Sequence, residues 1–197
     1  MRRVLQATVL VGALLLASGC ALVDRAGSAA VVDGVRYTNE QLEADFVSLD
    51  KALGTADKPA TMEEINRNFI AIFVGDQVMQ KAIADNNVTP DKAVIGKLRR
   101  QLEVQLGGEK ELEAYAASRG ISPSQLWTVL RNSVLTTDLG AALVGGTDTD
   151  AQNSAASEYL AMVAASMDIE VAPRFGKWDP SQMTAVAYDD LSTLAAV

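Results

Sequence analysis

The chain has 197 residues, a formal net charge of −8, one cysteine and no histidine. An acidic chain is repelled by nucleic acid and by anionic lipid headgroups. The absence of histidine removes the usual general base and the commonest transition-metal ligand, and one cysteine allows no disulfide within the chain. We therefore expect no enzyme, no catalytic residue, no metal or cofactor, and neither nucleic acid nor a small-molecule substrate as partner.

The first twenty residues have the pattern of an export signal. Arg2 and Arg3 form a short cationic start. The apolar stretch from Val4 to Ala17 is too short to span a bilayer as a stable helix, and small residues then lead into Cys20. The pattern indicates targeting rather than folded structure.

The residues Ala17-Ser18-Gly19 before Cys20 resemble a bacterial lipobox, in which the cysteine thiol receives a diacylglycerol and cleavage makes it the first residue. Ala17 stands where leucine is usual, and the alternatives are a plain secretory signal, an uncleaved anchor or a twin-arginine route. Two or three acyl chains give a lasting membrane anchor. We expect a signal peptide at 1–19, lipidation at Cys20, a tether at 20–29, and a location on the extracytoplasmic face of a bacterial membrane.

The next elements are a β-hairpin and a helix. Asp33-Gly34 lies between short β-prone pieces within residues 31–37, and Asp-Gly is the turn chemistry of a tight hairpin. Thr38 and Gln41 then form a capping box, which predicts a helix from about Asn39 to Leu53. The apolar face of this helix is Leu42, Phe46 and Leu49.

A polar connector containing Pro59 leads to a longer helix. Thr61 and Glu64 form a second capping box. Apolar residues follow at helical spacing: Met62, Ile65, Phe69, Ile72, Met79 and Ile83. Because residues 68–74 are apolar almost all round, we expect this helix to be buried on more than one side and to lie at the centre of the domain.

Thr89-Pro90 predicts the start of the following helix, with threonine as N-cap and proline at the first helical position. Gly107-Gly108 ends it, and its inner face is Val94, Leu98 and Leu102. A short helix from Glu109 to Arg119 follows and ends at Gly120.

Ser122-Pro123 caps another helix, which we expect to end at Gly145-Gly146. Its apolar side is Trp127, Leu130, Val134, Leu135, Leu139 and Leu143. An alanine-rich helix from about Asp150 to Met167 comes next, and its small side chains allow close helix packing. Ile169-Glu170-Val171 then alternates like a strand.

The hairpin at 31–37, the segment 86–90 and the segment 119–126 together resemble the N-terminal chaperone domain of the SurA and PrsA family of extracytoplasmic foldases. The ending 169–179, with Pro-Arg-Phe-Gly-Lys-Trp-Asp, is similar to the returning segment of that family. The resemblance implies a mainly α-helical domain over residues 30–180, with a small β-sheet formed by the N-terminal hairpin and a returning C-terminal strand.

The remaining residues, 181–197, are expected to form a C-terminal tail, either loose or folded as a short packed helix. In the family a parvulin-type prolyl isomerase domain is often inserted before the returning strand. The segment between Val144 and Ile169 is much too short for that domain, which also normally carries histidines. The resemblance therefore implies the chaperone module without the isomerase.

The function implied by the resemblance is that of a membrane-anchored, ATP-independent holdase, which binds apolar segments of exported polypeptides. The alternative is a structural or adaptor lipoprotein that keeps the fold and binds one dedicated envelope partner. A broad concave apolar surface would favour the holdase, whereas a flat, well-packed patch would favour the adaptor.

Large flexible side chains are the candidates for binding such clients: Met62, Phe69, Phe73, Met79 and Trp127. The alternative for each is that it is ordinary core, which is favoured because a helix bundle without disulfides needs most of its large apolar side chains inside. We assign none of them as a binding site from the sequence.

Two further segments allow a functional and a structural interpretation. Asp148-Thr149-Asp150 could open a calcium loop, but Asn153 and Tyr159 stand where that loop needs glycine and glutamate, so a helix start is favoured. The segment from Arg174 to Trp178 could be a recognition motif, since arginine and tryptophan are common binding anchors. A structural clasp over the hairpin is the favoured interpretation.

Overall fold

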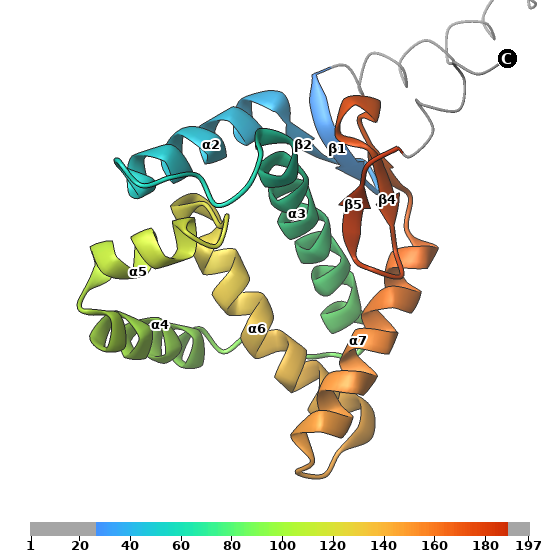
Figure 1. The fold of residues 1–197 in the computed structure, drawn as a ribbon. Coiled ribbons are helices and arrows are strands. Elements are labelled where there is room, and N and C mark those ends of the chain that lie inside the picture. The colour runs from blue at the N-terminus through green and yellow to red at the C-terminus, as the bar shows by residue number, and fades with distance from the viewer. Residues whose placement is uncertain (1–26, 189–197) are drawn as a thin grey trace, which may run out of the picture.

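The computed structural model describes residues 27–188, most of which are helical (Figure 1). The helices are α2 (Asn39–Leu53), α3 (Met62–Asp85), α4 (Lys92–Leu106), α5 (Glu109–Ala117), α6 (Pro123–Val144) and α7 (Thr149–Ser166). The strands form small antiparallel sheets. The fold is therefore mainly α-helical with a small sheet, as the sequence predicts. Cys20 and the predicted signal peptide lie outside the described residues.

The N-terminal hairpin and a late strand form one sheet. β1 (Ser28–Val32) pairs with β2 (Val35–Thr38) on one side and with β3 (Ile169–Val171) on the other. The turn at Asp33-Gly34 has positive φ angles of 45° and 84°, which aspartate and glycine adopt more readily than most residues. The Asp33 N–H donates to the Asp168 carbonyl and the Asp33 carboxylate accepts from the Asp168 N–H, both at 2.9 Å. The returning strand therefore closes on the hairpin.

The helix starts follow the predicted positions except at α4, although Ser122 at the start of α6 makes no side-chain capping bond. Both predicted capping boxes are present: Thr38 with Gln41 and Thr61 with Glu64. The prediction that α4 starts at Thr89-Pro90 is wrong, because Asp91 is the N-cap. Its carboxylate accepts from the N–H groups of Ala93 and Val94 at 2.8 and 3.3 Å. Aspartate caps a helix at least as well as threonine does, so the helix begins after the last good cap of the segment.

α3 is the central helix, as its sequence predicts. Its side chains Phe69, Ile70, Val74 and Val78 are fully buried. The helix packs against α6, α7, β1 and β5 (Thr184–Val186), which surround it (Figure 1). A second, smaller apolar cluster lies among α4, α5 and α6 and consists of Ile95, Leu112, Ala116, Leu126 and Leu130. The molecule thus has one main core and one satellite core.

A buried polar network joins the sheet to the helices. The Asp45 carboxylate of α2 accepts hydrogen bonds from the Tyr37 hydroxyl of β2 and from the Ser124 hydroxyl of α6. Ser124 and Ser122 share a further hydrogen bond of 2.5 Å. The Tyr37 ring stacks on Phe73 of α3, with 5.1 Å between ring centroids. This Asp45 network (Tyr37, Asp45, Ser122 and Ser124) holds β2, α2 and the start of α6 together.

Residues 169–186 form a clasp over the core. After β3, a short 3₁₀ helix (Pro173–Phe175) leads into β4 (Lys177–Asp179), which pairs with β5. Phe175 and Trp178 pack against the main core, to which the hairpin residues Ala30 and Val32 also belong. The structure therefore supports the clasp interpretation of this segment.

The structure differs from the predicted boundaries at both ends of the domain. The expectation of a loose tail or a short helix after residue 180 is wrong for residues 181–186, because β5 pairs with β4 and buries Ala185 to 4% exposure. At the other end, β1 begins at Ser28, inside the tether predicted at 20–29. β1 is held by the distant strand β3, whereas β5 pairs with the neighbouring strand β4 and packs on the distant helix α3.

Candidate functional site

An open groove of about 490 Å³ lies between α3, α6, α7 and the turn that joins β4 to β5. Its apolar lining comes mainly from Ile72, Met79, Val129, Leu160, Ala161 and Met183, and its polar lining from Asn132, Thr136, Ser157, Ser181 and Gln182. The groove is the most apolar of the described pockets and is walled by four separate elements. We therefore take it as the candidate functional site.

The groove exists because α6 and α7 diverge. Near their connection the two helices approach closely, since Gly140 of α6 is buried and a Cβ atom there would overlap the Gln152 carbonyl of α7. Away from this contact the helices separate with α3 beside them (Figure 1). Gly75 of α3 lines the groove, and a Cβ atom there would have no heavy atom within 4 Å. Gly140 therefore permits the close contact of α6 with α7, and Gly75 leaves the groove open on the α3 side.

One end of the groove is formed by the β4–β5 turn. The Asp179 carboxylate accepts from the Ser181 hydroxyl at 2.6 Å, from the Ser181 N–H at 2.9 Å and from the Gln182 side-chain amide at 2.9 Å. These bonds, the Ser181 hydroxyl first, hold the pKa of Asp179 below its ordinary value. They fix the turn so that Ser181, Gln182 and Met183 line the groove.

Arg131, the cation beside the groove, is paired with an acidic residue. Arg131 of α6 forms an ion pair with Asp76 of α3, next to the lining residues Asn132 and Gly75. Both side chains are largely covered, with exposures of 22% and 17%. The pair bridges two walls of the groove and neutralises Arg131.

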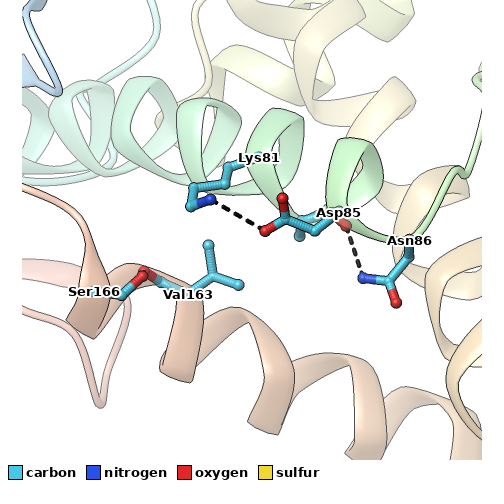
Figure 2. Close-up of polar contacts among 6 residues, drawn as sticks. Lys81, Asp85, Asn86, Val163 and Ser166 are labelled. Atoms are coloured by element: carbon cyan, nitrogen blue, oxygen red, sulfur yellow. Dashed lines mark hydrogen bonds and ion pairs between the residues drawn. The ribbon is translucent and has the colours of Figure 1, made fainter.

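Figure 2 shows the next turns of α3 beyond Met79, where the helix lies against α7. Lys81 is paired with Asp85 at 3.1 Å, and the Asn86 side-chain amide donates to the Ala82 carbonyl at 2.9 Å. Val163 of α7 points toward this part of α3 and is buried. The polar groups here pair within α3, and the groove lining on α3 ends at Met79.

Two acidic groups on the helices that wall the groove have no cationic partner in the described part of the chain. Asp138 on α6 has its pKa raised, first because burial disfavours its charged form and second because Asp91 lies nearby. Neither Asp138 nor Glu158 of α7 has an ion-pair partner among residues 27–188. Within that part of the chain, no group of three or more histidine, cysteine, aspartate and glutamate side chains is arranged to hold a metal ion.

The candidate residues named from the sequence fall in three places. Met79 is 3% exposed, yet it lines the groove from α3. Phe69 is fully buried in the core, and Phe73 is occupied by its stack with Tyr37. Met62 and Trp127 are 44% and 38% exposed but lie outside the groove lining. The structure thus brings one of these residues to the site and adds Leu160 and Met183, which the sequence did not indicate as site residues.

The described residues define a protein class only at the level of architecture: a mainly α-helical domain with a small antiparallel sheet and an open, largely apolar groove. None of its described helices has the length and apolar character needed to cross a membrane. No family model matches the chain, and neither does any curated protein or solved structure.

Proposed function

We propose that the protein is an ATP-independent holdase, anchored through a lipid on Cys20 at the extracytoplasmic face of a bacterial membrane. It transiently shields apolar segments of exported polypeptides and has no prolyl isomerase activity. The observation that carries the proposal is the concave apolar groove between α3, α6 and α7. The export signal and the resemblance to the SurA and PrsA chaperone domain support the same function.

The size of the groove indicates how a client would be held. A volume of about 490 Å³ lies in the range of small-ligand sites, roughly 300–1,000 Å³, so the groove accommodates one or two apolar side chains. Burying each is worth about 1.5–3 kcal/mol. Association costs about 4–15 kcal/mol in lost freedom. Each contact is therefore weak and short-lived, which suits transient shielding.

A membrane anchor compensates for weak contacts. Many copies tethered to one surface present many grooves to the same emerging chain, and linked binding events raise the overall affinity without any new contact. Met79 and Met183 suit varied clients, because a thioether side chain is flexible and polarizable. The mechanism is reversible burial of client side chains, with the acidic surface keeping the complexes soluble.

The experiment uses residues 20–197 with Cys20→Ser, so that no free thiol remains. Light scattering follows the aggregation of several unrelated unfolded exported proteins at increasing molar excess of the chain. We expect suppression for all of them and no acceleration of proline-limited refolding.

Two matched variants test the groove itself. Ser157→Trp places an indole at the groove lining, whereas Ser133→Trp makes the same change on an exposed part of α6 outside that lining. We expect Ser157→Trp to lose suppression and Ser133→Trp to keep it. If a folded sample suppresses nothing, the holdase proposal fails and the adaptor, with one dedicated partner, takes its place.

A further inference from the structure

We propose that the groove selects apolar client segments that are flanked by lysine or arginine. This inference rests on the proposed holdase function and names the class of segment that the same site takes. It is carried by the combination of an apolar groove with walls whose charged side chains are predominantly acidic.

The walls of the groove consist of four segments that contain the lining residues: 68–80 of α3, 129–144 of α6, 149–166 of α7 and the turn 179–183. Their acidic residues are Asp76, Asp138, Asp150, Glu158 and Asp179. Their sole cation is Arg131, and Asp76 neutralises it. The whole stretch from residue 132 to residue 173, which includes α7 and most of α6, has no lysine or arginine.

Two cations on α3 lie just outside these segments, and each has an acidic neighbour. Arg67 precedes the lining residue Ala71 by four positions and lies near Glu64. Lys81 follows the lining residue Met79 by two positions and is paired with Asp85 at 3.1 Å (Figure 2). Glu158, in contrast, is exposed beside the lining residue Ser157 and has no ion-pair partner among the described residues.

A groove lined by one sign of charge concentrates ligands of the opposite sign. An apolar side chain of a client would enter the groove while cationic neighbours in the client stay at its solvated edge, near Glu158. Exposed pairs of this kind are individually weak and are screened by salt. We therefore expect a preference of about 3–10-fold at low ionic strength, which shrinks as salt is added.

Fluorescence anisotropy with three labelled peptides measures this preference, using the chain of residues 20–197 with Cys20→Ser. The peptides share one apolar centre and are flanked by lysine, by serine or by glutamate. We expect affinity to fall in that order at low salt and the differences to shrink at high salt. Peptides that bind equally would overturn the charge preference and leave the holdase proposal standing, whereas no binding of any peptide by a folded chain would overturn both.

A pair of variants locates the effect. Glu158→Lys reverses a charge beside the groove, and Glu43→Lys makes the same change in net charge on α2, whose main packing partners are α3, α5 and α6. We expect Glu158→Lys to abolish the preference for lysine flanks and Glu43→Lys to retain it. Equal losses in the two variants would assign the preference to net charge and would overturn its placement at the groove.

Discussion

Gly140 and Asp45 each fix a contact between elements that are distant in the sequence. Gly140 lets the backbone of α6 approach that of α7, and the Asp45 carboxylate receives hydroxyl groups from β2 and α6. Neither contact tolerates a change easily, because the first leaves no room for a Cβ atom and the second needs hydroxyl donors for a buried carboxylate. Single substitutions at these positions therefore test the described packing.

We predict that Gly140→Ala destabilises the protein by about 1–3 kcal/mol or more, because the new methyl group would overlap the Gln152 carbonyl and push α7 away. Gly75→Ala is the matched control, since its methyl group meets no atom within 4 Å and alanine favours a helix over glycine by roughly 0.5–1 kcal/mol. Urea unfolding measures both. An unchanged midpoint for Gly140→Ala would contradict the close approach of α6 and α7.

Tyr37→Phe removes the hydroxyl that donates to Asp45 while keeping the ring stack on Phe73. We predict a loss of about 1–3 kcal/mol, because a buried carboxylate oxygen loses its donor. Tyr115→Phe serves as the control, because Tyr115 is 45% exposed. The same urea titration measures both variants, and equal stability of the two would contradict the Asp45 network.

The network also predicts a dependence on alkaline pH. Burial first, and then the hydrogen bond to Asp45, raise the pKa of Tyr37 above its ordinary value of about 10. The folded state therefore keeps its proton where the unfolded state has lost it. The contribution of Tyr37 to the free energy of unfolding is fully present below about pH 10 and is lost as the pH rises further. Tyr37→Phe should lessen that fall, and Tyr115→Phe should not.

At the scale of elements, local signals predicted helices well. The capping box at Thr38 and the glycine after Leu53 predict the bounds that α2 has, because both signals act within one turn of the helix. The start of α4 was harder to predict, since Thr89 and Asp91 are both good N-cap residues. The structure shows that Asp91 is the one used.

Elements that depend on distant contacts could not be predicted in the same way. β5 has three residues and no sequence signature, and its hairpin with β4 packs on α3, which lies about a hundred residues earlier in the chain. The groove needs residues from α3, α6, α7 and the β4–β5 turn, whose spatial arrangement is set by contacts such as Gly140 against Gln152. Periodicity placed Ile72 and Met79 on α3 but could not indicate that they face an open space.

The clasp should stabilise the whole domain. Deleting residues 168–197 removes β3, β4 and β5, and with them Phe175, Trp178 and Ala185 from the main core. We predict that this deletion abolishes cooperative thermal unfolding or lowers its midpoint strongly. A subtler change is Gly176→Ala, where φ is 109° and a Cβ atom would overlap the Val186 carbonyl. Thermal unfolding like that of the unchanged chain in both variants would contradict the structural role of the clasp.

At the scale of the whole molecule, stability is expected to be uneven. α3 is buried along most of its length, whereas α4 buries Ile95 alone and belongs to the satellite core. Regions with few buried apolar contacts open more readily than the core. We predict that native-state hydrogen exchange is slowest in α3 and fastest, among the helices, in α4. Equal protection of the two helices would mean that the cores unfold as one unit.

The proposed function requires that unfolded clients enter the groove. NMR of labelled methionine methyl groups tests this directly, because Met79 and Met183 line the groove whereas Met62 is exposed at the start of α3, outside the lining. Upon titration with an unfolded exported protein, we predict that the Met79 and Met183 signals shift or broaden while the Met62 signal stays unchanged. Shifts confined to Met62, or no shift at any methionine while the client is shown to bind, would contradict the groove as the binding site.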